Sequence, residues 1–313
     1  MKILRLLPFI GLILAGLSFP VFSAWPAWGK MNVLATTTDL AALARAVGGE
    51  RVEVTSLTSG LQDVHFVDPK PSLIHQARRA DALILVGADL EAGWLPPLLG
   101  SARNGKILPG APGHVDTSKA VKLLDAPGAG VDRSQGDVHP QGNPHHWLDP
   151  INAVAAARLI EARFARIDPG GRSYFKGQAD DFERTIEKRL PEWQARLAPF
   201  KGRRVLTYHR SWDYFALRFG LVVAGELEPK PGIPPSAAHL ARLAQKIKDE
   251  RISILIKEGH YETQSARFLA ERTGLRIVEL PLSVGGAPGV ETYERLMDVL
   301  TETLRGAFQG AGR

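Results

Sequence analysis

The stretch Ala82–Val86, with the sequence ALILV, is apolar at every position and lies between Asp81 and Gly87. A strand with no polar face is typical of a parallel sheet that helices cover on both sides. Helical patterns precede and follow it, over 71–80 and 91–99, and this alternation of strand and helix indicates an α/β fold. The stretch therefore predicts a parallel sheet in the first half of the chain.

The same alternation extends outward from this strand to both ends of the chain. Apolar periodicity over 172–197 predicts one long helix near the middle, which Pro191 is expected to kink or split. Asp39 is expected to cap the helix after the first strand. We predict two parallel-sheet α/β lobes, 31–168 and 199–313, joined by a rigid linking helix over 169–198. Further strands are expected over 31–37, 51–57, 204–208, 221–224, 252–257 and 276–280.

The first 23 residues have the pattern of a cleavable signal peptide. Lys2 and Arg5 precede an apolar run, and cleavage is expected after Ser23. A membrane anchor is the alternative, although the run is short for a span of about 20 residues and contains Gly and Pro. Cysteine is absent, which excludes disulfides, thiolate sites and lipid attachment at a cleavage-point cysteine. These features predict a free protein of the bacterial periplasm.

Charge and composition exclude another class of function. The formal net charge of +6 is mild for 313 residues, and basic residues alternate with acidic ones, as in Glu187-Lys188-Arg189. Without a basic stripe interleaved with aromatic residues, nucleic-acid binding is not expected. The segment 109–146 is instead rich in Gly, Pro, Asp and His, and a loop of this length is usually functional or disordered.

Three distant segments each contain a histidine next to turn residues or a strand end. His65 follows Asp63 in a loop, His145 and His146 follow an Asn-Pro turn, and His209 directly follows the strand expected over 204–208. Loops after parallel strands are where open α/β sheets bind ligands. Three neutral imidazoles and one further ligand suit zinc or another late first-row divalent ion. The alternative is that these are surface or helix-capping histidines.

The remaining histidines have weaker claims to a site. Glu258 and His260 follow the strand expected over 252–257, so both are candidates for a fourth ligand. His114 and His139 fall in the 109–146 segment, where weak metal scavenging is the most we expect. Helix surfaces are the expected places for His75 and His239.

Four segments in order resemble the metal-binding receptors of bacterial ABC importers, the family of zinc- and manganese-binding periplasmic proteins. The resemblance covers nearly the whole chain from Met31 to the C-terminal helix. Each motif alone is weak evidence for the resemblance. The resemblance is strong because all four occur in this order along the chain. The motifs are Asp63-x-His65, Gly87-Ala88-Asp89-Leu90-Glu91, Pro144-His145-x-Trp147-x-Asp149-Pro150, and His209 followed by Tyr214-Phe215 and Phe219-Gly220-Leu221.

This resemblance implies two lobes joined by a rigid long helix, with one metal ion in the cleft. His65 and His145 would bind it from the first lobe and His209 from the second. A histidine rather than a glutamate at the third position favours zinc, while manganese and iron stay possible. The aspartate that the family places in a segment matching 280–286 is missing here, and Ser283 is the nearest match.

The missing aspartate leaves the fourth ligand open. Glu258 is the first choice, because a carboxylate completes three imidazoles, and His260, Asp63 and water are the alternatives. We expect a monomeric receptor, not an enzyme, that delivers zinc to the membrane permease of an ABC importer. Its metal affinity should fall as the pH drops through about 6.5. The alternatives are a tri-histidine zinc hydrolase with Glu258 as general base, and an adhesin or chaperone stabilised by metal.

Overall fold

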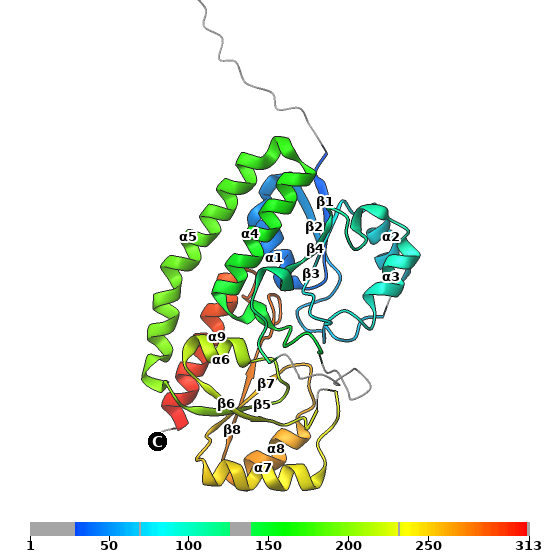
Figure 1. The fold of residues 1–313 in the computed structure, drawn as a ribbon. Coiled ribbons are helices and arrows are strands. Elements are labelled where there is room, and N and C mark those ends of the chain that lie inside the picture. Colours follow the sequence, from blue (N-terminus) through cyan, green and yellow to red (C-terminus); the bar gives the residue numbers. More distant parts are fainter. Residues whose placement is uncertain (1–28, 69, 126–138, 231, 312–313) are drawn as a thin grey trace, which may run out of the picture.

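The computed structural model of the chain describes residues 29–68, 70–125, 139–230 and 232–311. The predicted signal peptide over 1–23 lies outside these residues. Figure 1 shows one sheet toward each end of the molecule and a long helix, α5 (Arg172–Leu197), running beside them. The predicted two-lobed architecture with a long connecting helix is therefore confirmed. Among the helices of the described chain, none combines the length and hydrophobicity that a membrane span requires.

The first sheet is parallel throughout, in the order β2-β1-β3-β4. Its third strand, β3, is buried at every position, as the apolar run predicts. The short strand β4 was missed, because it lies in the Gly- and Pro-rich segment predicted as a loop. The elements of this lobe are β1 (Met31–Ala35), α1 (Thr38–Gly48), β2 (Val52–Ser56), α2 (Pro71–Arg79), β3 (Ala82–Leu85), α3 (Leu95–Ala102) and β4 (His114–Asp116).

The helix predicted over 91–99 begins later, at Leu95. The reason is that Glu91 is buried and its side chain is occupied elsewhere. Its carboxylate accepts hydrogen bonds from the Thr36 hydroxyl at 2.6 Å and from the Val86 amide at 2.7 Å. Glu91 thus joins the ends of β1 and β3, the point where the strand order reverses and where such sheets usually bind ligands.

The second sheet repeats the topology of the first. Its strands are parallel and lie in the order β6-β5-β7-β8, which is the order 2-1-3-4 within each lobe. The sequence showed no internal repeat, so the likeness is one of topology. The elements are β5 (Arg204–Thr207), α6 (Asp213–Phe219), β6 (Val222–Glu226), α7 (Ala237–Asp249), β7 (Ile254–Glu258), α8 (Gln264–Thr273) and β8 (Arg276–Leu280).

Three long helices join the lobes: α4 (Pro150–Ile167), α5 and α9 (Tyr293–Ala311). One apolar core runs through all three and reaches both sheets. Pro191 neither splits nor ends α5, contrary to one of the two outcomes predicted for it. A proline inside a helix removes one backbone hydrogen bond, and the buried side chains of Ile186, Trp193 and Leu197 hold the helix against the core on both sides of it.

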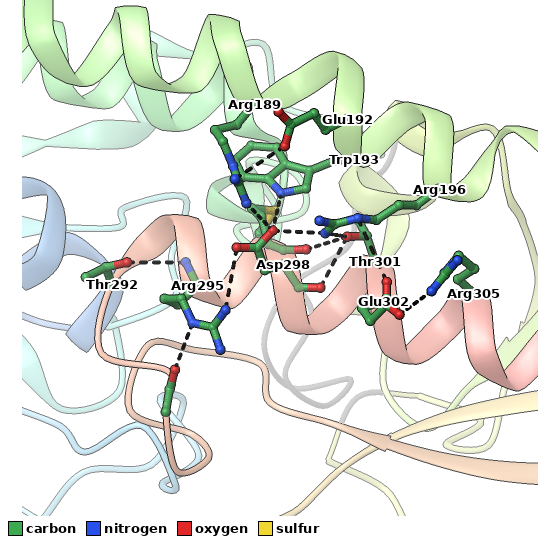
Figure 2. Close-up of polar contacts among 12 residues, drawn as sticks. Arg189, Glu192, Trp193, Arg196, Thr292, Arg295, Asp298, Thr301, Glu302 and Arg305 are labelled. Carbon is green, nitrogen blue, oxygen red and sulfur yellow. Dashed lines mark hydrogen bonds and ion pairs between the residues drawn. The ribbon is translucent and has the colours of Figure 1, made fainter.

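An ion-paired cluster, here called the Asp298 network, fastens α5 to α9 (Figure 2). One carboxylate oxygen of Asp298 accepts hydrogen bonds from Trp193 Nε1 at 3.0 Å, from Arg196 at 2.9 Å and from Arg189. Arg295 lies 3.8 Å from the other oxygen. Burial alone raises the Asp298 pKa, but these donors and charges outweigh it and hold the pKa below its usual value.

The predicted capping role of Asp39 is wrong. Thr37 caps α1, since its hydroxyl accepts a hydrogen bond from the Leu40 amide. Asp39 is completely buried and accepts a hydrogen bond at 2.9 Å from the amide of Val284, which follows β8 in the other half of the chain. Trp147 Nε1 also donates across the molecule, to the Leu282 carbonyl. These bonds tie the two lobes together beneath the site described next.

Candidate metal centre

Three of the predicted histidines converge between the lobes. His65 lies in the loop after β2, His145 precedes the short helix η5 (His146–Leu148), and His209 follows β5. These residues are 4%, 0% and 3% exposed, and one ring nitrogen from each lies within 4.8 Å of the other two. Among the residues that the structure describes, this is the group of metal-ligating side chains that is close enough to share one ion.

The ring spacing matches the geometry of one tetrahedral metal ion. Zinc–nitrogen bonds of about 2.0–2.1 Å place the centroids of two imidazoles about 5.2 Å apart at the tetrahedral angle. The observed separations are 5.1 Å for His65 and His209, 5.3 Å for His65 and His145, and 5.4 Å for His145 and His209. The backbone therefore holds the three rings at the spacing that a bound zinc ion needs.

Each ring is oriented through its Nδ1 atom by a different polar partner. His65 Nδ1 lies 2.8 Å from the Asp63 carboxylate, and His145 Nδ1 lies 2.9 Å from the Asn143 side-chain oxygen. These acceptors fix Nδ1 as the protonated nitrogen, so Nε2 carries the free lone pair. The Nε2 atoms of His65 and His145 are buried and have no hydrogen-bond partner within the described chain.

The third ring is oriented from the second lobe. His209 Nδ1 lies 2.8 Å from the carboxylate of Glu228, which also accepts a hydrogen bond from the Gly232 amide at 3.3 Å. Metal-binding histidines typically make such a contact to a carboxylate or carbonyl oxygen, which sets the tautomer and raises ligand basicity. Each of the three rings therefore has a polar partner at Nδ1 that sets its orientation.

Burial and neighbouring charges separate the acid–base behaviour of these groups. Burial lowers the pKa of His145 well below its usual value, and the adjacent histidines lower it further. Burial also lowers the His209 pKa, but hydrogen bonding to Glu228 and its charge outweigh this and raise it. For Asp63, burial raises the pKa, while the contact with His65 reverses the effect and brings it to about 2. A carboxylate that stays ionised offsets the charge of a divalent ion.

Glu258, the predicted fourth ligand, is not a member of the group within 4.8 Å. It is fully buried at the end of β7, and one carboxylate oxygen accepts a hydrogen bond at 2.9 Å from Trp212 Nε1. Burial raises its pKa to about 7. The geometry thus brings three of the four predicted ligands together and leaves Glu258 outside the group.

His146 is directed away from the three rings. Its Nε2 atom lies 3.2 Å from the Val86 carbonyl and 3.4 Å from the Thr117 hydroxyl, inside the first lobe. Burial lowers its pKa to about 4. Adjacent residues point in different directions, and here the structure assigns the inward position to His145.

Two of the orienting residues lie at the same short distance in the sequence from the histidines that they hold. Asp63 precedes His65 by two positions, and Asn143 precedes His145 by two. In both, the side-chain oxygen also accepts a hydrogen bond from the backbone amide of the histidine, at 2.9 and 3.0 Å. This is the local turn that Asp and Asn favour. Glu228 carries no such sequence signal, because 19 residues separate it from His209.

A cavity of about 500 Å³ opens beside the site. His65 contributes to its lining, whereas His145 and His209 do not. Phe66 at its margin is 59% exposed. The cavity brings solvent close to one of the three rings and leaves the others enclosed. Its other lining residues are Leu57, Gln62, Phe66, Val67, Asp68, Lys70, Leu73, Gly93 and Trp94.

Comparison with known proteins places the chain among metal receptors. The family described as zinc-uptake complex component A, periplasmic, matches residues 33–307. The zinc-binding lipoprotein AdcA of Streptococcus pneumoniae is 23% identical over 90% of this chain and 56% of its own length. The chain thus spans little more than half of that relative.

Two other relatives match along nearly their full length. The metal ABC transporter substrate-binding lipoprotein SloC of Streptococcus mutans is 24% identical over 88% of each chain. The solute-binding protein FpvC of Pseudomonas aeruginosa, solved in complex with Mn²⁺, shares the fold with a TM-score of 0.74. It is 21% identical, and the match covers 91% of this chain and all of that one.

Proposed function

Because the chain belongs to the family of the periplasmic component A of zinc-uptake complexes, we propose that it is a receptor for a divalent metal ion, most suitably zinc. It captures the ion between its lobes and delivers it to the membrane permease of an ABC importer. The observation that carries this proposal is the convergence of His65, His145 and His209, whose rings stand at the spacing of tetrahedral zinc ligands. A periplasmic location agrees with the family description.

In this proposal the three histidines bind the ion through Nε2. Asp63, Asn143 and Glu228 hold the rings in place and keep the proton on Nδ1. Zinc suits this set, because imidazole is a ligand of zinc and other late first-row ions, whereas manganese prefers oxygen ligands. Some relatives have names that refer to zinc, and one structural neighbour was solved with Mn²⁺. The choice of zinc over manganese is therefore a more specific proposal than metal binding itself.

The lobes should move little when the ion binds. The apolar core is continuous through α4, α5 and α9, and Asp39 and Trp147 bond across the base of the cleft. Release to the permease then depends on loosening the loops that carry the histidines rather than on wide opening of a hinge.

Zinc titration of the metal-free protein tests the site. We expect His65→Ala and His209→Ala to weaken zinc binding by more than 100-fold, because loss of even an orienting partner typically costs 10–100-fold. Affinity is measured in competition with a chelator of known strength. His75→Ala is the matched control, since His75 is exposed on α2, and it should bind zinc as the unsubstituted protein does. Unchanged affinity in both site variants would disprove the proposed site.

Growth under zinc limitation tests delivery. Deletion of the gene should impair growth in a chelated medium, the natural gene should restore it, and the His209→Ala gene should not. An adhesin or a metal-stabilised chaperone would leave zinc-limited growth unaffected. A hydrolase would turn over ester substrates above the buffer rate, and we expect no such turnover from the zinc-loaded protein.

A further inference from the structure

A fourth imidazole, that of His139, lies beside two of the three rings of the site. His139 is 9% exposed, and its ring centroid is 5.3 Å from that of His65 and 6.4 Å from that of His145. It belongs to the Gly- and Pro-rich segment in which the sequence indicated only weak metal scavenging. The structure places it beside the ligands instead.

The spacing of His139 from His65 is that of a fellow ligand. Two imidazoles on one tetrahedral zinc ion have centroids about 5.2 Å apart, and the 5.3 Å between His139 and His65 equals that between His65 and His145. The 6.4 Å to His145 is about 1 Å longer than this value. His139 is therefore outside the group whose ring nitrogens lie within 4.8 Å of one another. A small movement of the short turn that carries His139 would close this gap.

The turn that carries His139 is fastened on both sides. The Gly142 amide donates to the His139 carbonyl at 3.0 Å, and the Asn143 amide donates to the Leu124 carbonyl at 2.8 Å. Gln141 donates from its side chain to Asp89 of the first lobe at 2.9 Å. Asn143, which ends the turn, orients His145. The backbone thus couples the position of His139 to that of a ligand already in place.

Two other candidates for the fourth position already make contacts. One carboxylate oxygen of Glu258 accepts from Trp212 Nε1, the other is buried without a partner in the described chain, and Glu258, like His139, is not in the group. The carboxylate oxygen of Asp63 that faces His65 accepts from both the backbone amide and Nδ1 of that residue. Its role in holding His65 is therefore incompatible with a simultaneous role at the ion through the same oxygen.

We propose that His139 is the fourth ligand and that the ion is held by four imidazoles, with no carboxylate bound to it. This inference rests on the proposed function. A neutral four-nitrogen shell favours zinc and other late first-row divalent ions and disfavours manganese, which prefers oxygen ligands. The charge of the ion is offset from behind the rings, by Asp63 at His65 and by Glu228 at His209. His139 then determines metal selectivity as well as affinity.

X-ray absorption at the zinc edge and chelator competition test this on the mature protein loaded with one equivalent of zinc. The unsubstituted protein should show four imidazole nitrogens, and His139→Ala should show three with at least tenfold weaker zinc binding. His139→Asp should bring an oxygen into the shell and lower the ratio of zinc affinity to manganese affinity by at least tenfold. His114→Ala is the control, because His114 contacts the Ile107 carbonyl away from the site.

The outcomes separate this inference from the proposed function. If the unsubstituted protein binds zinc and His65→Ala abolishes binding, while His139→Ala changes neither the imidazole count nor the affinity, His139 is not a ligand and the function stands. If Glu258→Gln or His260→Ala removes one ligand from the zinc shell, that residue holds the fourth position and the inference is overturned. If zinc does not bind the unsubstituted protein, the proposed function itself fails.

Discussion

The histidine site and the Asp298 network both concentrate polar side chains between helices and lobes, but they differ in how fully their atoms are paired. In the Asp298 network, one carboxylate oxygen accepts three hydrogen bonds, from Arg189, Trp193 and Arg196. At the histidine site, the Nε2 atoms of His65 and His145 are buried without a partner in the described chain. The Asp298 carboxylate is thus held by several donors, although Arg189 Nε is buried without a partner in the described chain, whereas the histidine site leaves two acceptor nitrogens that a metal ion can fill.

This difference has an energetic meaning. A buried polar atom left without a hydrogen bond costs roughly 1–3 kcal/mol of folding free energy. The Asp298 network contains paired charges and supports the attachment of α5 to α9, whereas the unpaired nitrogens of the histidine site should lower the stability of the metal-free protein. Four experiments test this difference between the histidine site and the Asp298 network.

The largest effect should be the stabilisation by zinc itself. An ion present at 1,000 times its dissociation constant adds about 4 kcal/mol to the free energy of unfolding. His145→Leu should remove this increment. It should leave the metal-free protein at least as stable as before, because leucine needs no hydrogen bond. Denaturant unfolding with and without zinc measures both quantities. A large loss of metal-free stability would show that His145 serves packing rather than binding.

The next effect concerns the residues that orient the rings. Glu228→Gln keeps an oxygen acceptor for His209 Nδ1 but removes the charge, and we expect zinc affinity to fall 10–100-fold with little change in metal-free stability. Chelator competition and thermal unfolding report the two results. Glu271→Gln, on the exposed face of α8, is the matched control. Equal affinities for Glu228→Gln and this control would mean that the carboxylate does not tune the site.

The Asp298 network should show the opposite behaviour. Asp298→Ala should lower the free energy of unfolding by about 1–2 kcal/mol, because charge-assisted hydrogen bonds are lost from a partly exposed cluster. The stabilisation by zinc should be unchanged. Denaturant unfolding of the metal-free and the zinc-loaded variant measures both the free energy of unfolding and its increase with zinc. Weaker zinc binding in this variant would indicate that the attachment of α5 to α9 is coupled to the site.

The smallest expected effect is a pH dependence of the free energy of unfolding that arises from Asp39. Burial raises its pKa from 3.8 to about 7 in the folded protein. A raised acid pKa means that the folded state holds the proton more tightly, so its stabilising contribution is complete below about pH 4 and is lost as the pH rises through 7. Metal-free protein should lose about 1 kcal/mol between pH 5 and pH 6 from this group.

The variant Asp39→Asn isolates this contribution. It keeps an oxygen to accept the Val284 amide and removes the titration, while His145 and the other groups titrate in both proteins. The difference in unfolding free energy between the two proteins should therefore slope with pH across 5–7. Parallel pH profiles would show that Asp39 is ionised in the folded state throughout this range.

Much of the fold could be predicted because it depends on local patterns. The apolar run of β3 and the periodicity of α5 indicated a buried parallel strand and a long helix, and both elements formed. Strand β4 was not predicted, and the start of α3 was placed too early. In these two places turn-rich sequence and a buried Glu91 override local preference, since one hydrogen bond of Glu91 comes from Thr36, which is 55 residues away in the chain.

For the candidate site, the sequence by itself determined which imidazoles were eligible and which local turns hold two of them. An aspartate or asparagine two positions before a histidine forms such a turn wherever the chain places it. Only the tertiary structure decided that His139 lies beside His65, that Glu228 orients His209 and that Glu258 is outside the histidine group. The reason is physical, because the spacing of buried rings depends on how two sheets pack through a shared core, and no local pattern encodes that distance.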